Sequence, residues 1–215
     1  MSKFQLATLA LAATLLAPPA WALGRGTGIY SLQLASSTAD LYSPPGGPYL
    51  SAYTHSEAGV RLEYWRLLSD DYAFTFAAGA GWFGETDKPG SAAGAGAPDK
   101  KYTQSSWSAR IGGDRVAKVG ERAVLFFGPG LEYWNGKATF DGILGPGKSS
   151  TQNVNRFSVD GRIGGHMMIT PHWAVTGHIG ERLGYATVSD KGATASWWPG
   201  STDAALGISL FVDEK

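Results

Sequence analysis

The stretch Val-Arg-Leu-Glu-Tyr-Trp at residues 60–65 decides the fold class. Its apolar side chains alternate with the charged side chains of Arg61 and Glu63. In a β-strand, successive side chains point to opposite faces of the sheet. The stretch therefore predicts a strand with one apolar face and one face that carries charge.

Three further segments show the same alternation. Their apolar sets are Phe74, Phe76, Ala78, Ala80 and Trp82; Leu125, Phe127, Leu131 and Tyr133; and Phe157, Val159, Ile163 and Met167. The opposing positions hold small or polar residues, among them Thr75, Gly128, Glu132, Arg156 and Ser158. A sheet with one greasy and one polar face is predicted throughout.

Segment length indicates where this sheet lies. The predicted strands are residues 25–34, 58–68, 72–83, 102–116, 123–135, 155–169, 173–187 and 202–212. Most are longer than the 5 or 6 residues usual in globular sheets. A tilted strand that crosses the hydrocarbon of a membrane needs about 9 to 11 residues. The lengths therefore favour strands that span a membrane.

The connections alternate in length. Short turns are predicted at Ser69-Asp70-Asp71, Lys118-Val119-Gly120-Glu121-Arg122 and Thr170-Pro171-His172, and long Gly/Pro/Ser-rich loops at about 35–57, 84–101, 136–154 and 188–201. Short periplasmic turns and longer extracellular loops are typical of outer-membrane barrels. The sequence thus predicts an all-β, eight-stranded, antiparallel up-and-down transmembrane barrel, with both chain ends on the periplasmic side.

The N-terminus is typical of a cleaved signal peptide. Lys3 gives a positive start, Leu6–Leu16 is an apolar run, and Ala20-Trp21-Ala22 fits the small-residue cleavage rule. A membrane-spanning helix is the alternative, but that run has about 11 residues where a span needs roughly 20. We expect residues 1–22 to be removed and 23–215 to form one barrel domain in the outer membrane of a Gram-negative cell.

Composition excludes several classes of function. The chain has 18 Lys plus Arg against 18 Asp plus Glu, which argues against a nucleic-acid partner. It has 0 Cys, so disulfides, thiol chemistry and thiolate metal sites are all excluded. We expect packing, hydrogen bonds and lipid to hold the fold together.

Aromatic residues fall where the two membrane interfaces are expected. Tyr72 and Trp173 directly follow short turns, which places them at the periplasmic rim. The outer rim is predicted to carry Trp82, Trp107, Tyr133, Trp134 and Tyr185.

The mature chain resembles the eight-stranded outer-membrane proteins typified by the transmembrane domain of outer membrane protein A and by outer membrane protein W. The strand count, the loop alternation and glycine-rich phrases such as Gly128-Pro129-Gly130-Leu131-Glu132-Tyr133 carry the resemblance. These features belong to the architecture, so the resemblance implies a barrel in the outer membrane rather than one particular function.

A polar network is predicted inside the barrel. Leu62-Glu63-Tyr64-Trp65 recurs as Leu131-Glu132-Tyr133-Trp134, and alternation sends both glutamates inward. The inward polar set is Arg61, Glu63, Arg110, Glu132, Asp160, Arg162, His166, His178, Arg182 and Asp203. An eight-stranded barrel is just wide enough for side chains to fill it. A plugged interior linked by ion pairs is therefore expected, and a narrow gated pore is the alternative.

Catalytic and metal sites find little support in the residues. His55-Ser56-Glu57 offers suitable groups, but adjacent strand residues point to opposite faces. A His-x-Ser phrase, which lipid A 3-O-deacylases would require, and an Asp-Ser pair, sought by analogy with the lipid A palmitoyltransferase, are both absent from the sequence. His166 and His178 could be diagonal neighbours without an obvious third ligand. We expect no enzyme activity, no cofactor and no metal.

The loops carry the remaining functional possibilities. Residues 91–98 are low in complexity, and Tyr42-Ser43-Pro44-Pro45 and Trp197-Trp198-Pro199 place rings and prolines in predicted loops. We expect a structural or surface-interaction role through these loops. Expected partners are outer-membrane lipids including lipopolysaccharide, and the barrel-assembly machinery and periplasmic chaperones during biogenesis. A channel for small or hydrophobic solutes and a lipid-A-modifying enzyme are the alternatives.

Overall fold

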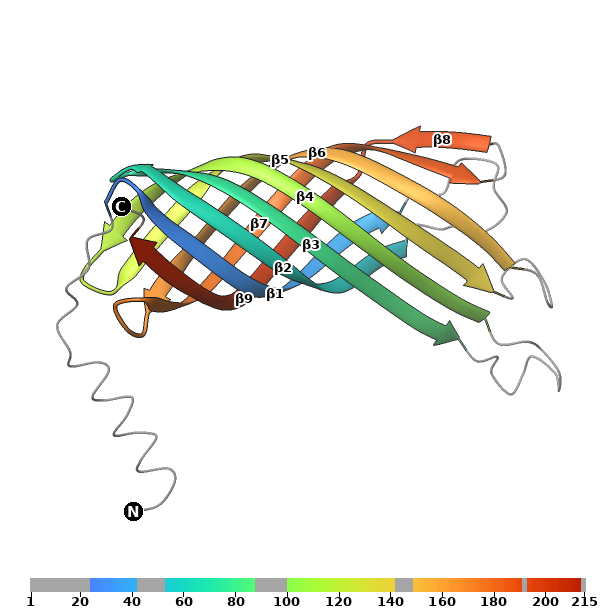
Figure 1. Ribbon diagram of the computed structural model, residues 1–215. Helices are drawn as coiled ribbons and strands as arrows, with labels where there is room; N and C mark the ends of the chain where they lie inside the picture. Colours follow the sequence, from blue (N-terminus) through green and yellow to red (C-terminus); the bar gives the residue numbers. More distant parts are fainter. Residues whose placement is uncertain (1–23, 42–52, 88–99, 142–148, 191–192, 214–215) are drawn as a thin grey trace, which may run out of the picture.

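A closed β-barrel accounts for the described chain, which comprises residues 24–41, 53–87, 100–141, 149–190 and 193–213 of the computed structural model (Figure 1). The strands are β1 (Thr27–Leu41), β2 (Tyr53–Ser69), β3 (Tyr72–Asp87), β4 (Lys100–Val119), β5 (Ala123–Asp141), β6 (Ser149–Met168), β7 (Trp173–Asp190), β8 (Ala193–Trp197) and β9 (Gly200–Asp213). No helix within these ranges is long and apolar enough to cross a membrane.

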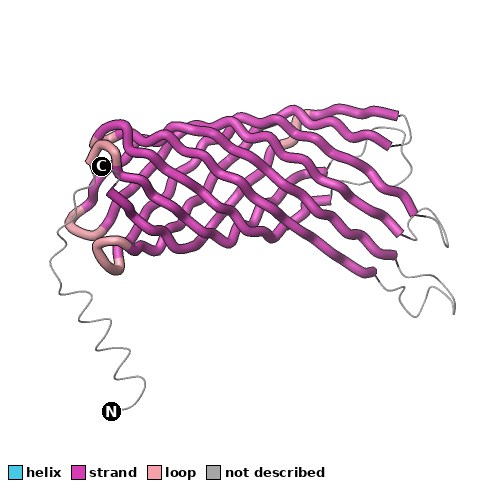
Figure 2. The backbone as a smooth tube through the Cα atoms, viewed as in Figure 1, coloured by secondary structure: helices cyan, strands magenta, loops and turns pink. Residues whose placement is uncertain are grey.

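Eight of these strands form the ring. Neighbours along the chain pair antiparallel from β1 to β7, β7 pairs with β9, and β9 pairs with β1 to close the barrel. Figure 2 shows the strands crossing the barrel wall obliquely, as closure of a sheet into a barrel requires. The predicted eight-stranded, antiparallel, up-and-down barrel is confirmed.

The two ends of the barrel differ in their connections. At one end, which we call the turn end, residues 70–71, 120–122 and 169–172 join consecutive strands. Gly120 takes a φ of 64°, a left-handed conformation that glycine adopts without steric cost. Thr27 pairs with Asp213, so the first and last strands also start and finish at the turn end (Figure 1). We call the opposite end, where the longer connections lie, the loop end.

The strands run further toward the loop end than the sequence predicts. Residues 35–41, 53–57, 136–141 and 149–154 belong to strands rather than to loops, and β8 forms within the predicted loop 188–201 by pairing with Ala186–Asp190 of β7. These extensions are rich in Ser, Thr and Asn, as in Ser149–Asn153. Strands beyond the membrane need no apolar face, so alternation could not reveal them. Residues 42–45 and 91–98 lie outside the described residues.

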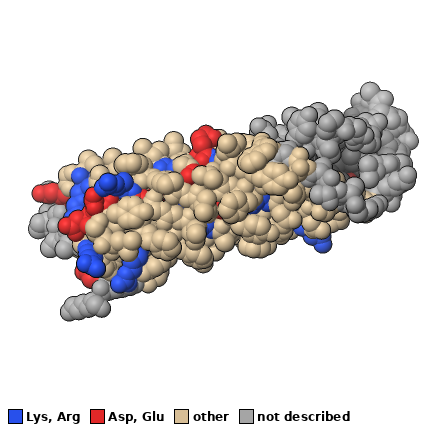
Figure 3. Space-filling view, turned by 90° about the horizontal axis from the view of Figure 1, so that it is seen from above, with Lys and Arg blue, Asp and Glu red and all other residues tan. Residues whose placement is uncertain are grey.

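The outward face is apolar through the middle of the barrel. Leu62, Phe76, Phe127 and Ile163 are between 45% and 62% exposed, and the predicted apolar sets all face outward. Figure 3 shows the charged side chains gathered toward the turn end and a largely uncharged middle. An apolar surface of this extent is unfavourable in contact with water and favourable in contact with lipid hydrocarbon.

Candidate functional site

All ten residues of the predicted polar network lie inside the barrel. None of them is more than 7% exposed, and they come from β2, β4, β5, β6, β7 and β9. Alternation explains their common direction, because each lies on the same face of its strand as other buried residues of that strand. The structure thus gathers both signs of charge in a narrow interior.

The first copy of the repeated phrase builds an ionic group near the turn end. Glu63 forms an ion pair with the Arg162 guanidinium of β6 and accepts a hydrogen bond from the Gln33 amide at 3.0 Å. The same guanidinium pairs with Asp114 at 2.8 Å and lies 4.7 Å over the ring of Trp65. One arginine therefore joins β2, β4 and β6 across the interior.

The second copy repeats this arrangement toward the loop end. Glu132 pairs with Arg156 of β6 at 3.4 Å, and the Arg156 guanidinium lies 5.3 Å over the ring of Trp134. In both copies the Glu and Trp of one phrase hold one β6 arginine. The repeat in the sequence thus corresponds to a repeated contact in the structure.

Arg61 and Arg182 extend the loop-end group. Arg61 pairs with Glu132 at 3.1 Å and with Asp203 at 3.2 Å, which links β2 to β5 and β9. Arg182 bridges the same two carboxylates, at 3.4 Å to Glu132 and 2.9 Å to Asp203. Each buried carboxylate here faces at least two cations, which offsets the cost of removing the charges from water.

Arg110 and Asp160 form a separate pair between β4 and β6. The Arg110 Nη2 and Nε atoms donate to the carboxylate at 2.7 Å and 2.9–3.0 Å, and Nη1 donates to the Thr75 hydroxyl at 3.1 Å. A two-point contact of this kind fixes the guanidinium in orientation as well as in distance.

An apolar cluster fills the interior at the turn end. Its members are Ile29, Trp65, Leu67, Ala73, Val116, Val124, Phe126, Met168, Ala174 and Phe211, each at most 7% exposed. The rings of Trp65 and Phe126 meet edge to face at 4.4 Å, and the His166 ring packs against both and against Phe211. We call this cluster the apolar plug, because it occupies the lumen from wall to wall.

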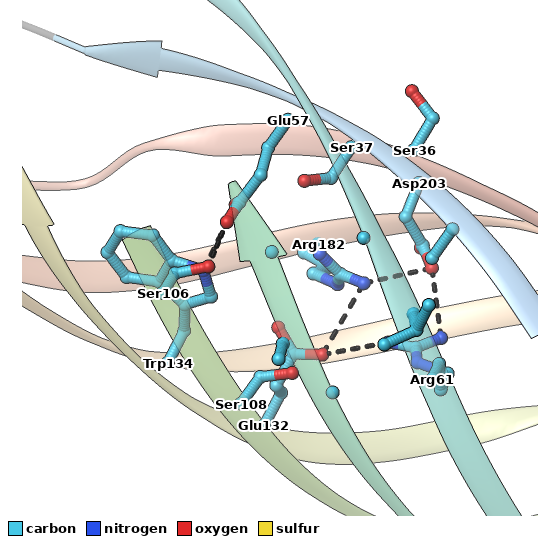
Figure 4. Close-up of a pocket in the computed structure, with 16 residues that line it drawn as sticks. Ser36, Ser37, Glu57, Arg61, Ser106, Ser108, Glu132, Trp134, Arg182 and Asp203 are labelled. Carbon is cyan, nitrogen blue, oxygen red and sulfur yellow. Dashed lines mark hydrogen bonds and ion pairs between the residues drawn. The ribbon is translucent and has the colours of Figure 1, made fainter. Parts of the chain in front are cut away.

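A cavity of about 50 Å³ lies on the loop side of the plug. Small residues of β1 to β4, among them Ser37, Gly59, Gly81 and Ser106, form one side of it. Figure 4 shows Arg61, Arg182, Glu132 and Asp203 linked to one another within the same lining. A polar space of this size has room for about three to five water molecules.

The two inward histidines do not share a ligand position. Gly164 of β6 pairs with His178 and His166 pairs with Thr176, so the histidines are diagonal neighbours. The His166 Nδ1 atom lies 2.7 Å from the Thr176 hydroxyl, whereas the His178 Nε2 atom contacts Arg61 and Asp203. The described residues contain no group of three potential metal-ligating side chains.

The sequence prediction missed several members of the network and misplaced one aromatic ring. Gln33, Asp114 and Glu57 also face inward. Asp114 lies on the same face of its strand as Arg110, and Glu57 on the same face as Glu63, so alternation could have predicted both. Trp134 is only 9% exposed and its indole N–H donates to Glu57 at 3.3 Å, so its predicted place on the outer rim is wrong. Tyr72, Trp173, Trp82, Trp107, Tyr133 and Tyr185 do face outward.

Comparison with known proteins identifies the fold. No family model matches the chain, and no curated protein sequence matches it. Among solved structures, the outer membrane protein OprG of Pseudomonas aeruginosa is similar at a TM-score of 0.58 and 12% identity, covering 89% of this chain and 98% of that one. Outer membrane protein AlkL, solved in lipid bilayers, gives 0.52 and 14%, covering 90% and 93%.

A third similar structure is Ail, the attachment invasion locus protein of Yersinia pestis, in complex with the heparin analogue sucrose octasulfate. Its TM-score is 0.50 at 15% identity, covering 87% of this chain and 99% of that one. Identities this low establish the architecture and leave the function open. The chain has the fold of the small eight-stranded outer-membrane β-barrels.

Proposed function

We propose that this chain is a non-enzymatic integral protein of the outer membrane, which acts as a structural scaffold and presents its loop end for surface interactions. The observation that carries the proposal is the division of the barrel into an apolar outer band and an interior that side chains block at the turn end. The band suits hydrocarbon, and the interior is occupied by the apolar plug and by the ion pairs above it.

The packing of the interior favours a scaffold function rather than a conducting pore. Arg61, Arg162 and Arg110 each join walls that are far apart in the sequence, so they brace the barrel against deformation. A conducting pore would need a continuous polar path, whereas Trp65 and Phe126 cross the lumen at the turn end.

The partners proposed for such a scaffold follow from its surfaces. The apolar band would contact outer-membrane lipids including lipopolysaccharide, and the loop end would face the cell exterior. During biogenesis the chain would depend on periplasmic chaperones and the barrel-assembly machinery, since its strands expose apolar faces until the ring closes.

Cell fractionation tests the location of the protein. The gel mobility of boiled and unboiled samples is then compared. We expect the protein in the outer-membrane fraction, with a heat-dependent change in mobility as the closed barrel unfolds. A periplasmic protein whose mobility does not depend on heating would contradict the proposal.

A narrow channel is the second candidate, and the cavity beside Glu132 and Arg182 is the observation that favours it. If the cavity extended through the plug under some condition, single-channel conductance in planar bilayers would detect it. Substitution of Glu132 or Arg162 should then change the current.

The absence of catalysis remains part of the proposal. His55 and Ser56 are consecutive residues of β2, which is an unsuitable arrangement for a nucleophile and its base. Mass spectrometry of lipid A from cells with and without the gene tests this point, and a difference in acyl chains would overturn it.

A further inference from the structure

Glu181 is a carboxylate set in the apolar outward face of β7. It is exposed, and the outward residues on either side of it in the strand are Ile179 and Leu183, at 61% and 62% exposed. On the neighbouring strand β6, Val159 and Ile163 flank its partner Gly161 and are each 56% exposed. A charged group therefore stands among side chains that would face lipid.

The depth of Glu181 follows from its place between two aromatic residues. Trp173 begins β7 at the turn end, and Tyr185 lies four residues beyond Glu181 toward the loop end. With a rise of about 3.3 Å per residue and a tilt of about 40°, the carboxylate lies ~10 Å below the level of Tyr185. This position is within the hydrocarbon of a bilayer whose interface lies at the aromatic rim.

Among the described residues, Glu181 is the only outward-facing charged side chain at this depth. The other outward charges of the described strands lie near their ends, such as Arg66 and Arg115 at the turn end and Lys101 and Lys137 at the loop end. The Thr202 hydroxyl of β9 donates to Glu181 Oε1 at 2.9 Å. A neutral hydroxyl satisfies part of the hydrogen-bonding capacity of the carboxyl group and supplies no opposite charge.

The barrel wall is open beside this carboxyl group. Gly161 is the direct register partner of Glu181, and a Cβ atom added at Gly161 would meet nothing within 4 Å. The wall next to Glu181 is thus bare backbone, which allows another surface to approach closely.

Ionisable groups inside membranes are costly, and they commonly pair with one another. A protonated carboxyl group is self-complementary, because it carries one donor and one acceptor. A second copy of the chain in the same membrane has the same orientation and presents its own carboxyl group at the same depth. A twofold axis normal to the membrane would bring the two groups together in an isologous contact.

We propose that the outward face around Glu181, Gly161 and Thr202 is the contact surface for a second copy of this chain in the membrane. Each Glu181 carboxyl group lies against the Gly161 wall of the other copy, and the two carboxyl groups share hydrogen bonds. This inference rests on the proposed membrane location.

The test uses the full chain folded into vesicles of dimyristoylphosphatidylcholine. Sedimentation after detergent extraction should give a dimer for the wild type and a monomer for Glu181→Leu, with association weakened at least tenfold. Glu181→Gln should keep the dimer, since an amide also donates and accepts. The chain has 0 Cys, so Gly161→Cys should form a cross-linked dimer cleanly, whereas Leu62→Cys on the opposite wall should not.

A monomeric wild type, or equal association of wild type and Glu181→Leu, would overturn the proposal. A wild-type monomer that retains a co-purified lipid lost in Glu181→Leu would assign the carboxyl group to lipid and also overturn it. Heat-dependent gel mobility of the same vesicle samples reports barrel insertion separately. A failure of the membrane location is therefore distinguishable from a failure of the contact.

Discussion

The turn-end and loop-end halves of the interior contain the same four-residue phrase and pack it differently. At the turn end, Trp65 is fully buried against Phe126 and His166. At the loop end, Trp134 borders a cavity whose far side is made of small residues such as Gly59 and Gly81. The phrase fixes a Glu and a Trp to one arginine, and the residues on the facing strands decide whether the space around them is filled.

Loss of the turn-end arginine should have the largest effect on stability. Arg162→Leu leaves Glu63 and Asp114 buried without their main cation. We expect the free energy of unfolding to fall by about 3–5 kcal/mol, measured by urea denaturation in vesicles. Lys137→Leu, at an exposed position, is the control and should change it by less than about 0.5 kcal/mol. Equal effects of the two variants would show that the interior ion pairs contribute little.

The two tryptophans compare the halves directly. Trp65→Ala should destabilise the barrel by about 3–4 kcal/mol, because the plug around it cannot collapse into the space left behind. Trp134→Ala should cost about half as much, since its ring already borders a cavity. Denaturation of both variants under one condition measures the difference. A larger loss for Trp134→Ala would reverse the assignment of the packed and the open half.

Larger side chains should destabilise the turn-end half more than the loop-end half. Ala174→Leu overfills the plug, where Ala174 is 0% exposed, and should cost about 1–3 kcal/mol. Ser108→Val adds bulk beside the cavity and should change stability by less than about 1 kcal/mol. The midpoint of thermal unfolding in detergent gives both values, and similar losses would mean that the cavity is not accessible to a larger side chain.

The smallest effect is expected where an ion pair is exposed at the turn end. The Arg115 Nη1 atom lies 2.5 Å from the Asp71 Oδ2 atom, and each of the two side chains is 62% exposed. Hydrogen bonding from Ser69, with a contribution from Arg115, lowers the pKa of the Asp71 carboxyl below its ordinary value. The resulting stabilisation is present above the unfolded-state pKa and is lost as pH falls through the folded-state pKa.

Carboxyl NMR of the wild type and of Ser69→Ala measures this shift. The pKa of Asp71 should rise toward its ordinary value when the Ser69 hydroxyl is removed. An unchanged pKa would assign the shift to Arg115 instead. Either way the exposed pair should contribute far less than the buried Arg162 group, because solvent screens it.

Alternation predicted the parts of the fold that the membrane constrains. Hydrocarbon requires outward apolar residues, so Leu62, Phe76 and Ile163 revealed their strands and faces. The sequence did not reveal the extensions at the loop end, such as Ser149–Asn153, or the short strand β8. These strands do not face hydrocarbon, so no alternation of apolar and polar residues is required of them.

The interior was predictable in composition but not in pairing. Parity placed Glu63, Glu132 and Arg162 inside, and it would also have placed Asp114 inside. Which arginine meets which carboxylate depends on the stagger of the strands around the ring, so Arg61 meeting Asp203 is not apparent in the sequence. The apolar plug was missed for the same reason, because its ten members come from all around the barrel.

Closure of the lumen by the plug is the point on which the contrast between the two halves depends. Single-channel recording of the wild-type barrel in a planar bilayer tests it most directly, with Trp65→Ala/Phe126→Ala recorded alongside. We predict no steady current through the wild type and discrete openings once the two rings are removed. A stable ohmic current through the wild-type barrel would contradict closure by the plug.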